Sequence, residues 1–322
     1  MLLSRRNFMQ LSAGFCLAST LPATFPAMVL GDETGTEKSS EQKLKLKSLR
    51  VSVGAEKPFR AVHISDTHLC YADERDNERK RNLATSRRRY FGDSERYFRL
   101  ALQHAQKNDA LFLHTGDLID FVSASNLDAV KNLFCDTNSY VSSGNHEFSQ
   151  YVGESKEDAA YKAQSYARVQ DAFPNDLTFC SRIVNGVNLV AIDDVYYNFT
   201  HVQLERFQAE VEKGLPIVMM CHCPLYTPEL FDEMMTARKS QCAYLVGVPK
   251  ERLGNYSAHR YEQQCPDIPT LEFIAWLRKQ PLLKAIFCGH LHFHWSGKFS
   301  ETATQYVVSA NYQGDAYDIT FC

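Results

Sequence analysis

Five short polar motifs, each placed directly after an apolar segment, constrain the fold of this chain more than any other feature. They are Asp66-x-His68, Gly116-Asp117, Gly144-Asn145-His146, His222-x-Pro224 and Gly289-His290-x-His292. Each apolar segment is short and typical of a buried strand. In open α/β sheets a ligand site lies outside the carboxyl ends of the strands. The pattern therefore predicts an α/β fold in which the five motifs converge in space.

Strand and helix signals alternate along most of the chain. The predicted strands include residues 59–65, 110–114, 140–141, 215–221 and 282–288. Apolar residues at helical spacing predict helices that begin near Ser94, Ser125, His201 and Thr270. Asn185-Gly186, between two more strand-like runs, predicts a two-residue hairpin turn. Because no internal repeat interrupts this order, we expect a single domain over residues 49–322.

The charge balance limits the class of partner. With 44% hydrophobic and 23% charged residues, the composition is that of an ordinary soluble globular protein. A formal net charge of -3 gives no global basic field, and such a field is the usual mark of binding to long nucleic acids. We therefore expect a small substrate and no long nucleic acid partner.

The first residues are read as a targeting segment. Arg5 and Arg6 are followed by Asn7 and Phe8, and no charge then occurs before Asp32. Residues 1–31 resemble a twin-arginine signal peptide, which implies export by the bacterial twin-arginine machinery to the periplasm or the cell exterior. An uncleaved signal that anchors the chain in the membrane is the alternative, because the uncharged run is long enough to span. The polar, lysine-rich residues 32–48 are predicted to form a linker.

The cysteines do not form a recognisable metal motif. The chain has 10 cysteines but no Cys-x-x-Cys pair, so no set of thiolate ligands is expected. Cys70 and Cys223 lie next to polar motifs, and we expect them to pack in the core, with redox sensing as a minor alternative. Cys242 and Cys265 bracket one long segment and could form a disulfide after export.

In order and spacing, the five motifs resemble the calcineurin-like metallophosphoesterase family over residues 59–292. The resemblance implies a two-sheet αββα sandwich and hydrolysis of a phosphate mono- or diester. In such a reaction a hydroxide that bridges two metal ions attacks phosphorus. Carboxylate oxygen and imidazole nitrogen ligands suit manganese, iron or zinc. A metal-binding scaffold without activity and a nuclease are the alternative functions.

The same resemblance assigns the metal ligands. It gives Asp66, His68 and His292 to metal one, gives Asn145, His222 and His290 to metal two, and makes Asp117 the bridge.

His146 and Asp66 are the predicted catalytic residues. His146 would act as general acid or stabilise the transition state, a role that suits an imidazole near pH 7, and the family pattern has Asp66 orient it. Purple acid phosphatases have a tyrosine three residues after the bridging aspartate. Here that residue is Asp120, so a tyrosinate-iron site is not expected.

Two long segments are predicted to set substrate choice. Residues 71–93 follow the first motif and contain Arg87, Arg88 and Arg89, which we expect to bind a further anionic part of the substrate. Residues 234–269 lack a clear periodicity. Each segment could instead be a solvated surface insertion. His294 is a further candidate for the substrate pocket, with a purely structural histidine as the alternative. The oligomeric state stays open.

Overall fold

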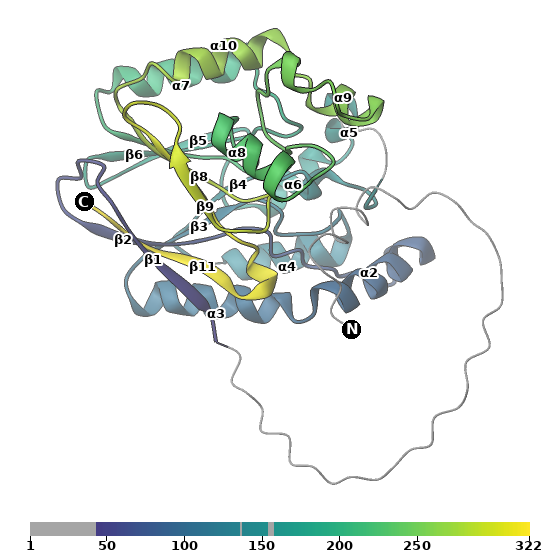
Figure 1. Cartoon of the computed structure of the whole chain (residues 1–322). Helices are drawn as coiled ribbons and strands as arrows, with labels where there is room; N and C mark the ends of the chain where they lie inside the picture. Colours follow the sequence, from purple (N-terminus) through teal and green to yellow (C-terminus); the bar gives the residue numbers. More distant parts are fainter. Residues whose placement is uncertain (1–42, 136, 154–157) are drawn as a thin grey trace.

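Two β-sheets packed face to face form the centre of the protein, and helices cover the outer face of each sheet (Figure 1). The computed structural model describes residues 43–135, 137–153 and 158–322. The predicted αββα sandwich in a single domain is confirmed. The predicted twin-arginine signal, residues 1–31, lies outside the described residues.

The first sheet carries the amino-terminal motifs. Its strands, in spatial order, are β1 (Lys45–Val51), β11 (Asp315–Phe321), β2 (Phe59–Ile64), β3 (Leu111–Thr115) and β4 (Ser139–Ser142). Strands β2, β3 and β4 are parallel, whereas β11 runs antiparallel to β2. The three parallel strands therefore direct their carboxyl ends, and the motifs that follow them, to the same edge.

The second sheet carries the remaining motifs. Its strands, in spatial order, are β5 (Phe179–Val184), β6 (Val187–Ile192), β7 (Ile217–Met220), β8 (Leu283–Cys288), β10 (Thr304–Val307) and β9 (Trp295–Lys298). Strands β6, β7, β8 and β10 are parallel. The predicted hairpin joins β5 to β6, and both turn residues have positive φ, 45° at Asn185 and 78° at Gly186. These angles are those of a type I′ turn.

Helices form the outer layers on both sides of the sandwich (Figure 1). Helices α3 (Ser94–Lys107) and α4 (Ala124–Phe134) lie on the first sheet, and α7 (His201–Glu212) and α10 (Ile268–Leu277) lie on the second. Helix α7 begins with a capping box between Thr200 and Gln203, which satisfies two backbone N–H groups that lack helical partners. The shorter or peripheral helices are α2 (Glu78–Phe91), α5 (Ala159–Ala163), α6 (Tyr166–Ala172), α8 (Pro228–Asp232), α9 (Ala258–Gln264), η1 (His146–Phe148), η2 (Glu233–Ala237), η3 (Lys250–Arg252) and η4 (Asn311–Gln313).

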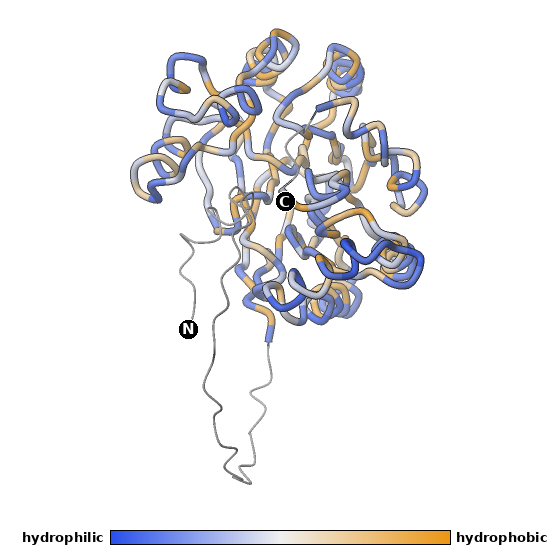
Figure 2. The backbone as a smooth tube through the Cα atoms, turned by 90° about the vertical axis from the view of Figure 1, so that its right-hand side faces the viewer, coloured by the Kyte–Doolittle hydropathy of each residue, from blue (hydrophilic) through white to orange (hydrophobic). Residues whose placement is uncertain are grey.

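A continuous apolar layer holds the two sheets together. Leu113 and Tyr317 from the first sheet meet Leu189, Val218 and Phe287 from the second, and all five are at most 1% exposed. Full burial of one such side chain contributes about 1.5–3 kcal/mol. Hydrophobic and hydrophilic stretches alternate along the tube in Figure 2. This packing fixes the spacing between the two sheets, and therefore between the two groups of motifs.

One segment differs from its prediction, and another gains a helix. Residues 45–48 were assigned to the linker, but they belong to β1 and pair with β11 from Lys45 opposite Asp315. The lysines of β1 are exposed, as is usual for an edge strand, and this composition resembles a linker. Residues 71–93 contain the 14-residue helix α2. Within the described ranges, no helix is both long and apolar enough to cross a membrane.

The buried cysteines of the described ranges carry free thiols. Cys221 and Cys288 are buried thiols with their sulfur atoms 3.5 Å apart. The predicted disulfide between Cys242 and Cys265 is wrong, because both thiols are free. The sulfur of Cys242 instead accepts a hydrogen bond of 3.0 Å from Gln264 Nε2.

Candidate metal centre

The predicted ligands meet where the carboxyl ends of the two sheets face each other. Asp66 and His68 follow β2, Asp117 follows β3, Asn145 follows β4, His222 follows β7, and His290 and His292 follow β8. The site is therefore built from both sheets, four ligands from the first and three from the second. Its geometry divides into two groups of atoms that share Asp117.

The first group joins Asp66, His68 and His292. His292 Nε2 lies 3.1 Å from Asp66 Oδ1 and 3.4 Å from His68 Nε2. His68 Nε2 is 3.9 Å from the same carboxylate oxygen. Their ligand atoms lie within 4.8 Å of one another. One carboxylate and two imidazoles at this spacing form a ligand set that suits a transition metal.

The second group joins Asp117, His222 and His290. His222 Nε2 lies 3.2 Å from Asp117 Oδ2 and 3.1 Å from His290 Nδ1. The same oxygen of Asp117 is 3.8 Å from His68 Nε2, in the first group. Asp117 therefore lies between the two groups, as a bridging ligand must. Asn145 Oδ1 is buried without a hydrogen-bond partner among the described residues, which fits an atom whose partner is a cation.

Hydrogen bonds on the far side of each ring fix the orientation of the histidines. His68 Nδ1 is 3.0 Å from Asp120 Oδ1, and His222 Nδ1 is 2.7 Å from the Thr115 carbonyl oxygen. The third ring, that of His290, has its Nε2 atom 2.9 Å from the hydroxyl oxygen of Tyr197. Such contacts settle which ring nitrogen keeps its lone pair for a metal. In each ring the second nitrogen lies next to another predicted metal ligand.

The backbone at the ligands is held in an uncommon conformation. Asp66, His68, Asp117, His290 and His292 all have positive φ, between 53° and 67°. Such conformations cost of order 1–3 kcal/mol each and persist only where the surroundings enforce them. The concentration of this strain at five ligands marks the region as functional.

Glycine is required beside two of the ligands. A Cβ atom at Gly144 would lie 2.4 Å from Asp117 Oδ1, and one at Gly289 would lie 2.5 Å from Asp66 Oδ2. Both distances are far below van der Waals contact, so any side chain at these positions would displace a ligand carboxylate.

The charge states of the site favour cation binding. Burial disfavours ionisation of Asp66 and Asp117, yet neighbouring histidines hold the pKa of both carboxyl groups below the ordinary value. Burial lowers the pKa of His290 to about 3, so this imidazole is neutral near pH 7. Although burial opposes it, Asp117 raises the pKa of His222. A cation would therefore replace a proton on that ring.

Asp120, rather than Asp66, contacts His146. His146 Nδ1 is 2.8 Å from the Asp120 carbonyl oxygen and 3.2 Å from its carboxylate Oδ1. The predicted orientation of His146 by Asp66 is therefore wrong. The physical reason is the bridge between Leu69 and Ile119, which continues the pairing of β2 and β3 beyond the strands. This pairing brings Asp120 against both His68 and His146.

Charge also affects the protonation of His146. Burial opposes protonation of this ring, but Asp117 and Asp120 raise its pKa to about 9. Cations bound beside Asp117 would lower this pKa. The result would approach the range in which a general acid works near neutral pH.

Arg87 supports the same aspartate. Its Nε lies 2.6 Å from Asp120 Oδ2 and its Nη2 lies 2.9 Å from Asp120 Oδ1. Asp120 is fully buried, so this paired contact neutralises a charge that water cannot reach. Arg87 was predicted to bind an anionic part of the substrate, but its guanidinium is already occupied. Helix α2 also places Phe91 flat against the His68 ring, with centroids 4.5 Å apart.

We expect Arg87→Ala to lower both stability and activity. Removal of one partner of a buried ion pair costs about 3–5 kcal/mol, and loss of support behind a metal ligand lowers metal affinity or activity about 10–100-fold. Thermal unfolding and hydrolysis of a small nitrophenyl phosphate would measure the two effects. Arg89→Ala, at an exposed position of the same helix, is the matched control. Equal behaviour of the two variants would contradict this role of Arg87.

Glu147 is a structural residue that was not predicted. This fully buried carboxylate accepts hydrogen bonds from the backbone N–H groups of Asp117, Leu118, Ile119 and Gly144, at 2.6–3.2 Å. It thereby ties the loop after β3 to the loop after β4. Its position directly after Gly144-Asn145-His146 was the only sequence signal. Burial raises the pKa of Glu147 to about 7.

Two tyrosines near His290 were also missed. Tyr197 and Tyr244 have positive φ, 62° and 56°, and their ring centroids lie 5.6 Å and 5.9 Å from that of His290. Tyr244 belongs to the predicted specificity segment 234–269, which therefore does reach the metal centre. Positive φ cannot be read from a tyrosine in a sequence, so neither residue could have been found there.

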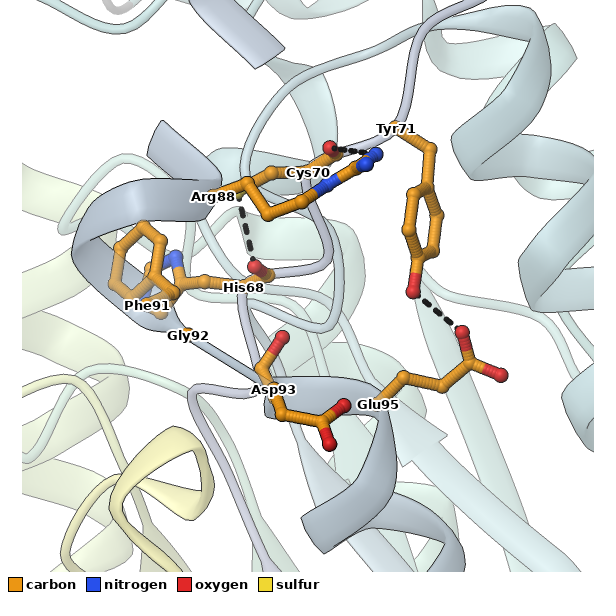
Figure 3. A pocket seen from close by; sticks show the side chains of 9 residues that line it. His68, Cys70, Tyr71, Arg88, Phe91, Gly92, Asp93 and Glu95 are labelled. Atoms are coloured by element: carbon orange, nitrogen blue, oxygen red, sulfur yellow. Dashed lines mark hydrogen bonds between the residues drawn. The ribbon is translucent and has the colours of Figure 1, made fainter. Parts of the chain in front are cut away.

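The remaining substrate candidates have different surroundings. Arg88 lines a pocket of about 230 Å³ beside His68, and its Nη2 donates to the Cys70 carbonyl oxygen at 3.1 Å (Figure 3). Arg89 is exposed on α2. His294 lies 3.5 Å from Asp315 through Nε2 and accepts from the Ser309 backbone N–H through Nδ1. Both nitrogens of His294 are thus engaged within the fold.

Solved structures with similar folds include several phosphoesterases. A dimetal phosphatase from Danio rerio has 15% identity and a TM-score of 0.46, covering 79% of this chain and 88% of its own. The phosphopantetheinyl hydrolase of Mycobacterium tuberculosis has 11% identity and a TM-score of 0.40, with 82% and 91% covered. A putative 5'-nucleotidase from Staphylococcus aureus has 12% identity and a TM-score of 0.40, covering 79% of this chain and 49% of its own.

These TM-scores lie below 0.5, so the family assignment rests on the family model alone. No curated protein sequence matches the chain significantly. The model of the calcineurin-like phosphoesterase family matches residues 59–294. That range contains all seven predicted ligands and most of the chain. The chain therefore belongs to the calcineurin-like phosphoesterase family.

Proposed function

We propose that this chain is a dinuclear-metal phosphoesterase that hydrolyses a small phosphate mono- or diester. The observation that carries the proposal is the pair of ligand groups that share Asp117. In each group a hydrogen bond at Nδ1 orients a histidine ring so that its Nε2 atom is directed to the site. When bound, two cations of manganese, iron or zinc would polarise the phosphate and lower the pKa of a water that attacks phosphorus. Membership of the family supports the reaction class.

The seven predicted ligands would be shared between the two cations. Asp66, His68 and His292 would hold the first cation, while Asn145, His222 and His290 would hold the second. Asp117 would neutralise charge on both, because its carboxylate lies between the groups.

His146 would supply a proton to the leaving group. Its backbone N–H donates to Asp117 Oδ1 at 2.9 Å, and its ring meets His68 edge-on at 4.7 Å between centroids. This position would lie beside a phosphate bound to the two cations. Because Asp120 occupies Nδ1, the Nε2 atom is left to face the substrate. Arg88, on the wall of the pocket next to His68, is our candidate for contact with a further anionic part of the substrate.

Activity should depend on bound metal. We expect chelation to abolish hydrolysis of both nitrophenyl phosphate and bis(nitrophenyl) phosphate, and manganese or zinc to restore it. The ratio of the two rates distinguishes a monoesterase from a diesterase. Elemental analysis of the chelated sample is the control. Full activity in a sample shown to be free of metal would exclude the proposed mechanism, whereas a metal-loaded sample without activity on either ester would favour the non-catalytic scaffold.

We also propose that residues 1–31 direct export by the twin-arginine machinery, to the periplasm or the exterior of a bacterial cell. Arg5 and Arg6 carry this proposal. The double variant Arg5→Lys and Arg6→Lys should leave the precursor in the cytoplasm, as measured by cell fractionation. Lys45→Arg, in the mature region, is a control of similar chemistry. Normal export of the double variant would rule out this route, and membrane association of the wild type would favour an uncleaved anchor.

A further inference from the structure

Cys223 forms a possible metal-binding group with His222 and His290, although the sequence suggested a packing role, with redox sensing as a minor alternative. It directly follows His222 and is 1% exposed. Its sulfur and the ligand nitrogens of His222 and His290 lie within 4.8 Å of one another. A thiol at this distance from two metal-binding imidazoles is within reach of the same cation after small adjustments.

The neighbouring cysteines do not share this position. The thiol of Cys70 donates to the His68 carbonyl oxygen at 3.1 Å. Cys221 lies 3.5 Å from Cys288, sulfur to sulfur. The thiol of Cys223, in contrast, makes no hydrogen bond within the described part of the chain. Among these four buried cysteines, its sulfur alone belongs to a group that could hold a metal.

The backbone around Cys223 is held firmly. The Leu225 N–H donates to Gln305 Oε1 at 2.9 Å, and the Val246 N–H donates to the Pro224 carbonyl oxygen at 2.9 Å. Pro224 itself restricts the backbone at the next position. The sulfur is therefore kept near the two imidazoles by the same short segment that presents His222.

A second observation concerns Asn145, the amide that the family resemblance assigns to the same metal. Its Oδ1 is buried and has no hydrogen-bond partner in the described ranges. His222 Nδ1 and His290 Nε2 are occupied by the Thr115 carbonyl oxygen and the Tyr197 hydroxyl. The two remaining ring nitrogens lie 3.1 Å apart, in the two residues that form a ligand group with Cys223.

We propose that Cys223 is a thiolate ligand of the second metal ion, beside His222 and His290. This inference rests on the proposed function and specifies one site of the dinuclear centre. Thiolate ligands favour zinc, ferrous iron or cobalt over manganese and magnesium. The first site, with Asp66, His68 and His292, lacks such a ligand. The two positions would thus differ in the metals they retain.

The binding step involves no oxidation. The S–H bond breaks, the sulfur–metal bond forms with the electron pair left on sulfur, and the proton passes to solvent. The metal keeps its oxidation state, and no co-reactant is needed.

Absorption spectroscopy of the cobalt-loaded full chain tests the proposal. We expect a near-ultraviolet thiolate-to-cobalt charge-transfer band in the wild type and in the control Cys70→Ser, and no such band in Cys223→Ser. Zinc affinity of the second site should fall about 10-fold or more in Cys223→Ser, whereas manganese affinity should change less. A band that persists in Cys223→Ser would overturn the proposal.

A measurement on the wild type decides the matter if Cys223→Ser does not fold. X-ray absorption of the zinc-loaded chain should show one sulfur at about 2.3 Å, distinct from nitrogen and oxygen ligands at about 2.0–2.2 Å. A wild type that binds metal and hydrolyses phosphoesters without a sulfur ligand would overturn only this inference. A wild type that binds no metal would overturn the proposed function with it.

Discussion

Asp117→Asn should lose metal and activity together. The carboxylate lies 3.2 Å from His222 Nε2 and 3.8 Å from His68 Nε2, so it would face both cations. One pair of unit charges about 4 Å apart contributes about 4 kcal/mol at an effective dielectric constant of 20. Loss of that attraction corresponds to about a 1,000-fold fall in rate. Elemental analysis and kcat/KM for a nitrophenyl phosphate would measure both effects.

Asp128→Asn is the control for this prediction. It makes the same chemical change at a half-exposed carboxylate on α4, which pairs with Arg75 on the surface. We expect its metal content and activity to equal those of the wild type. If Asp117→Asn kept both metals and most of its activity, Asp117 could not be the bridge, and the division into two ligand groups would be wrong.

His146→Ala should fail in a different way. Because His146 is placed to protonate the leaving group, its loss should lower kcat about 10²- to 10⁴-fold for esters of poorly acidic alcohols. Esters with acidic leaving groups, such as nitrophenol, need less protonation and should lose less. Metal content should stay unchanged. Steady-state kinetics over a series of leaving groups, with elemental analysis of each sample, would show this pattern.

The same experiment distinguishes a second possible role. The ligand atoms of His146, His68 and Asp117 also lie within 4.8 Å of one another, so His146 could bind a cation. In that case His146→Ala would lose metal, and its loss of rate would be similar for all leaving groups. His201→Ala, at an exposed position on α7, is the control and should behave as the wild type.

The position of the metal centre could be predicted because its signals are local. Asp66, Asp117 and His222 each follow an apolar strand, and parallel strands bring such residues to one edge. The hairpin at Asn185-Gly186 was predictable for the same reason. The start of β1 was not, because the exposed lysines of an edge strand resemble a linker, and its pairing with β11 joins opposite ends of the chain.

The residues behind the ligands could not be found in this way. Arg87 reaches Asp120, which is 33 positions away in sequence, and an arginine cluster gives no sign of a buried partner. Tyr197 contacts His290 across 93 positions. Such contacts depend on how helices and loops pack after the sheets have formed. A local pattern identifies residues that can bind a metal, but not those that orient them.

The placement of the ligands on both sheets links the catalytic centre to the apolar layer described above. Four ligands move with the first sheet and three with the second, so any slide of one sheet over the other would separate the two halves of the coordination sphere. A substitution at Phe287, deep in that layer, could thus impair the enzyme without touching a ligand. The metal content of a variant therefore reports on the relative position of the two sheets. Substitutions that lower activity need not lie near the metal ligands.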